Sequence, residues 1–250
     1  MVVLPSDHFI NQESIFVETV NQAVEIAERR RGLITIGIKP TRPETGYGYI
    51  QMGNRVRGNI PTFKVTRFTE KPNLEIAKDF LIDGNYLWNS GMFVWRADVY
   101  LREMQKYLPE MYNCLMEVYK TIGTDEEEKT TNRQYELIEG ISVDFGIMQK
   151  TRKAYVIKSE FQWDDIGSFS AMSRFADNYR GNSVKGKTFL EQSENCFVMG
   201  KEKLIIGFGI KDLIIVDSGD VLLVMDKNRD QEIKHLVNLL KEKHKYDEYL

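Results

Sequence analysis

Two short polar segments carry the carboxylates most able to hold a metal ion. Asp7 lies in LPSDHFI, directly after an apolar run, and Asp164 and Asp165 lie side by side in FQWDDIGSF. Carboxylates brought together from separate loops form an oxygen-only site, which suits Mg²⁺ bound beside substrate phosphates rather than zinc. Asp7 could equally cap its own loop, and paired aspartates are common in surface turns. His8 has no second histidine at a metal-binding spacing, so we expect it to hydrogen-bond within its loop.

Three polar side chains further along the chain are suited to binding a sugar phosphate. Lys71, in FTEKP, offers a point charge at the end of an expected strand. Glu70 accepts hydrogen bonds, and Asn89 in WNSGMFVW both donates and accepts them, so this pair suits sugar hydroxyls. Taken alone, each of the three is also an ordinary surface or loop residue.

A glycine-rich segment, TGYGYI at residues 45–50, follows the proline-rich KPTRPE. Glycine provides both the backbone freedom of a tight turn and the room for a main chain to approach a ligand closely. The segment is therefore either a turn between two strands or a backbone shaped to touch a ligand.

The first elements predicted by hydrophobic spacing are a strand, a helix and a strand. Residues 2–4 are an apolar run that predicts the end of a buried strand, and residues 13–31 carry apolar residues at helical spacing. LITIGI, residues 33–38, predicts a second buried strand. This is the βαβ unit, whose strands are parallel. Asp7 would then follow the carboxyl end of a parallel strand, where open α/β sheets bind ligands.

The middle of the chain alternates between expected strands and helices. Strands are predicted at residues 63–68 and 86–95, and helices at residues 74–84, 99–107 and 109–119. We expect the aromatic residues around NSG, Trp88 and Trp95 included, to be mostly core. The acidic run TDEEEK, residues 124–129, is expected to be a solvated loop or helix face.

SVDFGIM is predicted to open a helix. Ser142 has the residue type of an N-cap, and Asp144 would lie in the first turn, where a negative charge is favoured. Helix capping is therefore preferred to catalysis as the role of Asp144.

After about residue 175 the chain becomes a series of short β runs separated by Gly, Asp and Lys turns. This change predicts a boundary near residues 176–181, with domains at residues 1–176 and 177–250. The tail returns to helical spacing, with Ile233, Leu236, Val237 and Leu240 on one face. Packing on the chain's own core is preferred for this helix, and packing on a second subunit of a homodimer is the alternative.

The overall composition is that of an ordinary globular protein. The 250 residues are 42% hydrophobic and 28% charged, with a net charge of −3, so no basic surface for a nucleic acid is indicated. Cys114 and Cys196 are far apart and suggest neither a disulfide nor a thiolate metal site. Since no apolar run reaches the length of a membrane span and no signal peptide is recognised, we expect a cytoplasmic protein without a membrane partner.

Several of these segments together resemble the mannose-1-phosphate guanylyltransferase family. They occur in the order LPSDHFI, PETGYGYI, FTEKP, WNSGMFVW, SVDFGIM, WDDIGSF, and the similarity continues through the β-rich tail. The resemblance covers nearly the whole chain. It implies a Rossmann-like α/β nucleotidyltransferase core, here without its first strands, followed by a small β-rich C-terminal domain with a terminal helix. It also implies that GTP and mannose 1-phosphate react with Mg²⁺ to give GDP-mannose and pyrophosphate.

The resemblance also implies roles for individual residues. Asp7 and Asp165 match the family's metal-binding aspartates, which are its catalytic carboxylates. Gly46 and Tyr47 match the segment that lines the sugar pocket, so we expect TGYGYI to approach the mannose. The sugar-hydroxyl and phosphate contacts match Glu70, Asn89 and Lys71.

Transfer would follow from positioning and charge stabilisation, with no side chain acting as the nucleophile. Two alternatives remain. One is a related enzyme using another sugar 1-phosphate or nucleoside triphosphate, and the other is a non-catalytic sugar-phosphate-binding or assembly module.

One segment expected from the resemblance is absent from these 250 residues: the Gly-rich phosphate loop GGxGxRLWP, which should precede everything seen here. That loop supplies backbone N–H groups and basic side chains for the GTP phosphates. We interpret Met1 as an internal start or a fragment boundary.

We therefore expect the purified chain to release no pyrophosphate from GTP, mannose 1-phosphate and Mg²⁺ beyond the release by an Asp165→Asn variant. A continuous pyrophosphate assay measures this. Release by the chain that the substitution abolishes would contradict the expectation.

Overall fold

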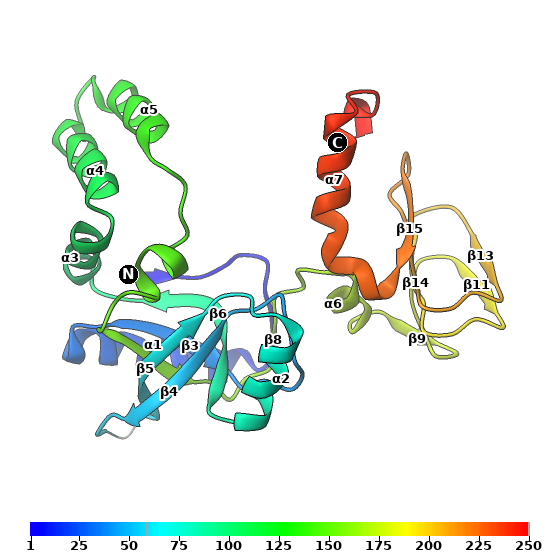
Figure 1. Cartoon of the computed structure of the whole chain (residues 1–250), viewed down its shortest axis with the longest axis horizontal. Coiled ribbons are helices and arrows are strands. Elements are labelled where there is room, and N and C mark those ends of the chain that lie inside the picture. The colour runs from blue at the N-terminus through cyan, green and yellow to red at the C-terminus, as the bar shows by residue number, and fades with distance from the viewer. Residues whose placement is uncertain (59, 250) are drawn as a thin grey trace. The chain divides into compact units, whose positions relative to one another are not determined.

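The computed structural model describes residues 1–58 and 60–249 as two units, Met1–Trp163 and Asp164–Leu250. The predicted α/β fold with a β-rich C-terminal region and a terminal helix is confirmed (Figure 1). The short strands predicted after the composition change begin at β9 (Asp177–Tyr179). The domain limits at residues 176 and 177 stay a prediction.

The first unit is built on a six-stranded mixed sheet in the order β1-β6-β3-β7-β5-β4, and a further pairing of β4 with β6 closes a circuit of strands. β3 and β7 are parallel, and the other neighbours are antiparallel. The strands are β1 (Val2–Val3), β3 (Leu33–Ile38), β4 (Tyr49–Arg55), β5 (Thr62–Thr69), β6 (Tyr86–Val94) and β7 (Ala154–Lys158). Two further strands of two residues each, β2 (Phe9–Ile10) and β8 (Trp163–Asp164), lie outside this sheet.

The prediction that the first strand is buried is wrong. β1 lies at the edge of the sheet and pairs only with β6, so Val2 and Val3 remain 43% and 39% exposed. Because β6 is antiparallel to both β1 and β3, these two strands run in the same direction without being neighbours. The parallel sense of the predicted βαβ unit therefore holds, and β3 is buried as expected, but β1 is not.

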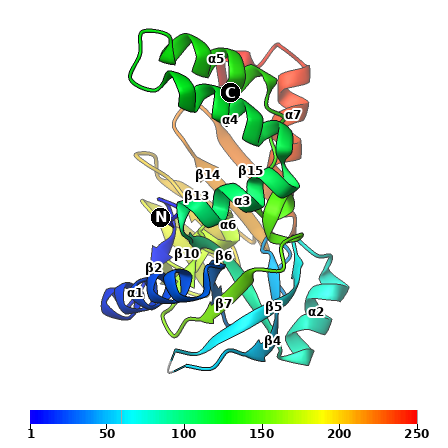
Figure 2. The ribbon, with the colours of Figure 1, turned by 90° about the vertical axis from the view of Figure 1, so that its left-hand side faces the viewer.

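In the described part of the first unit, the α-helices follow where the apolar spacing predicted them, with α5 as an addition. The predicted helices are α1 (Glu13–Arg30), α2 (Leu74–Asp83), α3 (Ala97–Tyr107) and α4 (Pro109–Thr121). α5 (Glu127–Leu137) was not predicted, because it is mostly polar and buries only Thr130 and Gln134. It pairs with α4 as a hairpin (Figure 2), and the acidic run at its start is exposed as expected.

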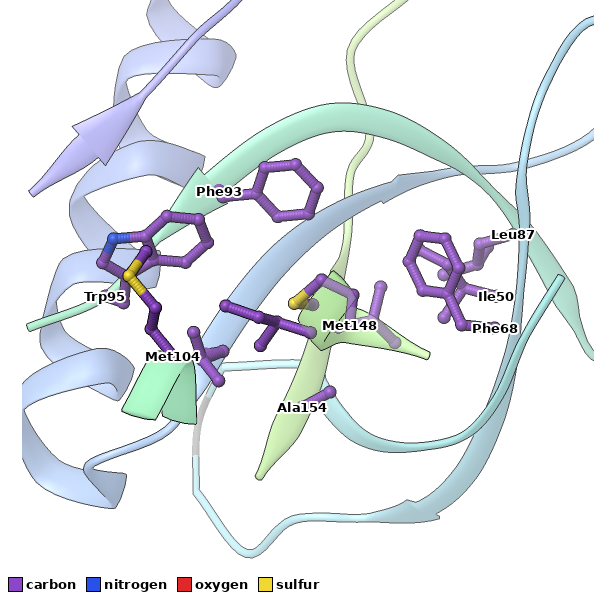
Figure 3. Close-up of a cluster of buried hydrophobic side chains, with 11 residues drawn as sticks. Ile50, Phe68, Leu87, Phe93, Trp95, Met104, Met148 and Ala154 are labelled. Atoms are coloured by element: carbon purple, nitrogen blue, oxygen red, sulfur yellow. The ribbon is translucent and has the colours of Figure 1, made fainter. Parts of the chain in front are cut away.

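One core cluster of the first unit packs between the sheet and the helices α3 and α4, and two others include residues of α1 and α2. Figure 3 shows the side chains of the first cluster, from Trp95 and Met104 at one end to Ile50, Phe68 and Leu87 at the other. Trp88 and Trp95 are 2% and 4% exposed, which confirms that the aromatic residues around NSG are core.

β6 changes partners half-way along its length. Its first half lies between β3 and β4, and its second half lies between β3 and β1. The change occurs at a bulge, where the register moves from Thr35 opposite Phe93 to Gly37 opposite Asn89. Gly91, at φ 70°, adopts the left-handed conformation that a bulge of this kind favours. Asn89 therefore lies at the point where the sheet divides.

The second unit stacks parallel strands without intervening helices. Its main sheet has the order β15-β14-β12-β10-β9, in which β10, β12 and β14 are parallel, and β11 and β13 form a second parallel pair. The strands after β9 are β10 (Asn182–Lys185), β11 (Thr188–Glu191), β12 (Phe197–Met199), β13 (Ile205–Phe208), β14 (Leu213–Asp217) and β15 (Leu222–Asp226). The short helix α6 (Phe169–Ser173) packs Phe169 and Met172 on the Phe197 cluster.

The terminal helix α7 (Ile233–Glu242) has no buried residue, and Leu236 and Leu239 are 38% and 40% exposed. It follows a 3-10 turn, residues 227–232, and contacts that turn. Packing on the core of its own unit is therefore partial. No helix within residues 1–58 and 60–249 combines the length and apolar composition that a membrane span needs.

A buried ion pair ties α3 to the segment before β7. Glu103 is 4% exposed and accepts hydrogen bonds from Thr151 Oγ1 at 2.7 Å and from Lys153 Nζ at 2.8 Å. Burial alone would raise the pKa of Glu103, but these two partners and the nearby lysine charge outweigh it, so the pKa lies below its ordinary value. The stabilisation is present at neutral pH and is lost as the pH falls through the lowered pKa.

Lys153→Met should lower the free energy of unfolding at pH 7 by about 1–3 kcal/mol, because Glu103 is left buried without its cation. The control is Lys120→Met, which breaks the exposed pair with Glu117 and should cost about 0–1 kcal/mol. Urea unfolding measures both. Equal losses in the two variants would contradict the structural role of Glu103.

Candidate functional site

Asn89 is the centre of a hydrogen-bonded group on the first unit. Its Oδ1 accepts from Thr35 Oγ1 and from the Gly91 backbone N–H, each at 3.2 Å, and its Nδ2 donates to Asp144 Oδ1 at 3.0 Å. The Asn89 backbone N–H donates to the Gly48 carbonyl at 2.8 Å. The bulge in β6, the TGYGYI segment and the start of SVDFGIM therefore meet at one residue, Asn89.

Glu70 lies against the backbone of the glycine-rich segment. A Cβ on Gly48 would lie 2.3 Å from Glu70 Oε2, so only glycine leaves room for this carboxylate. Glu70 Oε2 is closed off from solvent and has no hydrogen-bond partner among the residues that the structure describes. Burial, and then the negative charge of Asp144, raise the pKa of Glu70, whereas Lys71 lowers it. A ligand that donates to this carboxylate would offset the cost of its burial.

Asp144 lies in a different local structure from the capped helix that the sequence predicted. It begins a π-helix, residues 144–148, whose N-cap is Val143 rather than Ser142 and which has no side-chain cap, so the predicted cap is wrong. The Asp144 side chain accepts from Asn89 instead. Burial raises the pKa of Asp144, and the hydrogen bonds that it accepts only partly offset this.

Lys71 supplies a positive charge that acts on both carboxylates. It follows β5 closely, is exposed, and adopts the left-handed backbone conformation at φ 44°. Its charge lowers the pKa of Glu70 and of Asp144. A cation beside two carboxylates and an amide matches the charge distribution of a sugar phosphate, which has one anionic group and several hydroxyls.

Aromatic rings pack beside this group. Tyr47 makes edge contacts with Trp88 and Trp163, at centroid distances of 5.2 and 5.1 Å, and the Arg42 guanidinium lies 4.9 Å above the Trp88 ring. Arg42 pairs with Glu44, whose carboxylate accepts from the Gly46 N–H at 3.2 Å. The turn at Gly46 is thus held by side chains from its own segment. Tyr47 is 7% exposed, so its ring is mostly core.

Asp7 is exposed in a loop that precedes β2. The neighbouring His8 accepts from the Trp163 Nε1–H through Nδ1 at 3.0 Å, which agrees with its expected role as a loop hydrogen-bonder. The role of Asp7 as a metal ligand stays a prediction.

The two aspartates of WDDIGSF differ in their surroundings. Asp164 is 6% exposed, forms an ion pair with Arg174 and accepts from the Ile166 N–H at 3.0 Å. Asp165 is half-buried and accepts from the Gly167 N–H at 2.9 Å. Asp164 therefore has a structural role. The role of Asp165 as a metal ligand stays a prediction.

The donor types available fit the expected Mg²⁺. Asp7 and Asp165 offer carboxylate oxygens, which suit a hard cation whose remaining ligands are waters and substrate phosphates. Within the described ranges, 1–58 and 60–249, no group of three or more His, Cys, Asp and Glu side chains is placed to hold a metal ion. Asp7 belongs to the first unit and Asp165 to the second, so their joint binding of one metal ion stays a prediction.

Comparison with known proteins places the chain in a family. The model of the family described as nucleotidyl transferase matches residues 1–181. The chain belongs to the nucleotidyl transferase family. A second model, described as a MannoseP isomerase/GMP-like beta-helix domain, matches residues 189–240, which include β12, β13 and β14 of the second unit.

Curated relatives confirm the resemblance seen in the motifs. A mannose-1-phosphate guanylyltransferase of Escherichia coli is 37% identical over 247 residues, which are 97% of this chain and 52% of the relative. Another of Klebsiella pneumoniae is 36% identical over 247 residues, again 97% and 52% of the two chains. The chain therefore spans about half the length of the curated relatives that it matches.

Two solved structures are also similar. A structure from Thermus thermophilus, described as a mannose-1-phosphate geranyltransferase, has a TM-score of 0.82 and 29% identity, and the match covers 96% of this chain and 69% of that chain. A Helicobacter pylori structure described as a mannose-6-phosphate isomerase has a TM-score of 0.54 and 27% identity, with 65% and 62% covered. The first match confirms the α/β fold over almost the whole chain.

The coupling of the two carboxylates gives a direct prediction. Asp144→Asn should lower the pKa of Glu70, because it removes a neighbouring negative charge, and Lys71→Met should raise it. The titration of the side-chain carboxyl ¹³C shift of Glu70 measures both changes. Glu139→Gln, which removes an exposed charge from the segment before Asp144, is the control and should change nothing. An unchanged Glu70 pKa in Asp144→Asn would show that the two carboxylates do not interact.

Proposed function

We propose that the chain binds mannose 1-phosphate and provides the sugar-phosphate site for the transfer of a guanylyl group from GTP, a reaction that gives GDP-mannose and pyrophosphate. The observation that carries the proposal is the placement of Glu70 against Gly48, beside Asn89 and Lys71. This arrangement combines a buried acceptor, an amide donor and a cation within one site. The choice of mannose 1-phosphate and GTP as substrates rests on the name of the relatives, mannose-1-phosphate guanylyltransferase.

Each residue has a distinct task in this proposal. Glu70 accepts from a sugar hydroxyl, and Asn89 donates to one, which together fix the orientation of the ring. Lys71 neutralises the phosphate and holds its oxygen for attack on the α-phosphorus of GTP. Gly46 and Gly48 bring the main chain close to the sugar, and Tyr47 supports that segment from the core side.

Asp7 and Asp165 would hold Mg²⁺ in this proposal. The ion would supply charge stabilisation on the phosphate oxygens. Both aspartates lie in loops, where a carboxylate can adjust to a ligand as it binds. Cytoplasmic synthesis of a nucleotide sugar agrees with the free thiols of Cys114 and Cys196.

A related sugar 1-phosphate or another nucleoside triphosphate is the alternative that the motifs leave open. The sugar site is tested by calorimetry with mannose 1-phosphate, glucose 1-phosphate and free mannose. We expect the order of affinity to be mannose 1-phosphate, glucose 1-phosphate, then mannose, because Lys71 requires the phosphate. Stronger binding of glucose 1-phosphate would favour the alternative.

Gly48→Ala should separate binding from folding. The new Cβ displaces the end of the flexible Glu70 side chain rather than backbone, so the melting temperature should change little. The affinity for mannose 1-phosphate should fall about tenfold or more, because the carboxylate loses its position. Gly140→Ala, in open space, is the control and should change neither quantity. Wild-type affinity in Gly48→Ala would remove Glu70 from the sugar site.

A further inference from the structure

Asp144 is a half-buried carboxyl group to which the proposed function assigns no task. We propose that Asp144 is a positioning residue of the sugar site: it holds the Asn89 amide so that Asn89 presents one N–H, and no acceptor, to the substrate. The inference rests on the proposed function for the identity of the ligand. It specifies which hydrogen-bonding group of that ligand Asn89 can bind.

The orientation of the Asn89 amide follows from its partners. The Gly91 backbone N–H can only donate, so the Asn89 atom that faces it at 3.2 Å is the oxygen. Thr35 Oγ1 donates to the same oxygen at 3.2 Å. The nitrogen therefore faces Asp144 Oδ1 at 3.0 Å, as a carboxylate acceptor requires.

Counting donors and acceptors shows what is left for a ligand. An amide oxygen has two lone pairs, and Thr35 and Gly91 occupy both. The amide nitrogen has two N–H bonds, and Asp144 takes one of them. Among the residues that the structure describes, the second N–H of Asn89 has no partner. Asn89 can thus only donate to a substrate, although an isolated asparagine both donates and accepts.

Asp144 is held rigidly enough to act in this way. The π-helix that it begins buries Gly146, Ile147 and Met148, the last two in the main core cluster. A Cβ on Gly146 would lie 2.9 Å from Leu108 Cδ1, so the turn packs closely on the chain between α3 and α4. The contact with Asn89 joins residues that lie 55 positions apart in the sequence. The core thereby fixes the carboxylate, and the carboxylate fixes the amide.

The consequence for the substrate is a defined pair of contacts. One hydroxyl oxygen accepts from Asn89, and a hydroxyl proton is donated to the carboxylate of Glu70. Because Asn89 offers no acceptor, replacing its hydroxyl by fluorine, which can accept weakly, should cost less affinity than replacing it by hydrogen. The site would therefore favour a substrate group that accepts a hydrogen bond from Asn89 over one that can only donate.

A double-mutant cycle on the full chain tests the proposal, with mannose 1-phosphate binding measured by calorimetry. Asp144→Ala should weaken binding about tenfold. Asp144→Asn should weaken it less, because an amide oxygen can still accept from Asn89. Asn89→Ala combined with Asp144→Ala should bind no more weakly than Asn89→Ala alone, because Asp144 acts through Asn89. Glu139→Gln, an exposed carboxylate removed from the same segment, should bind as wild type does.

Additive losses in the cycle, or wild-type affinity in Asp144→Ala, would overturn the positioning role while leaving the proposed function intact. Absence of binding by the wild-type chain to mannose 1-phosphate and glucose 1-phosphate would overturn the proposed function. The positioning role is then decided by a second measurement that needs no ligand. The two Asn89 side-chain N–H protons should exchange with solvent at different rates, and Asp144→Ala should make the rates similar. Equal rates in the wild-type chain would overturn the role.

Discussion

The site depends on one constraint: buried carboxylates must find a partner, a proton or a ligand. Glu70 and Asp144 both lie in the first unit with pKa values raised by burial, and each is near the charge of Lys71. Asp144 has its partner in Asn89, whereas one Glu70 oxygen has none among the described residues. The folded chain therefore keeps a buried, unpaired acceptor on Glu70 and a spare N–H donor on Asn89, the two kinds of group to which a sugar hydroxyl can hydrogen-bond.

The scaffold provides this arrangement through two departures from regular strands. The bulge in β6, with Gly91 in the left-handed conformation, lets the Gly91 N–H reach the Asn89 side chain. Gly48 accepts a hydrogen bond from the Asn89 backbone in β6, and its lack of a side chain leaves the space that the Glu70 carboxylate occupies. A side chain at Gly48 would displace that carboxylate, and one at Gly91 would be strained by its positive φ. The closed circuit of β3 to β7 then holds these segments at fixed positions.

The sequence allowed most helices and strands to be predicted, because their apolar residues recur at the spacing of buried faces. It did not reveal α5, whose buried residues are polar, nor the edge position of β1, since a short apolar run has no feature that marks its neighbours. Motif order predicted Glu70, Lys71 and Asn89 as members of one sugar-phosphate site, and their roles there stay a prediction. The contact of Asp144 with Asn89 could not be predicted from the sequence, because the two residues lie 55 positions apart. The SVDF pattern also indicates a capped helix, whereas Asp144 begins a π-helix without a side-chain cap.

The most direct test of the sugar site is a crystal structure of the chain with mannose 1-phosphate. We predict a sugar hydroxyl within hydrogen-bond distance of Asn89 Nδ2, a second hydrogen bond to the Glu70 carboxylate, and the phosphate beside Lys71. A sugar bound with its hydroxyls away from Asn89 and Glu70, or a hydroxyl donating to Asn89 Oδ1 in place of Thr35, would contradict this prediction.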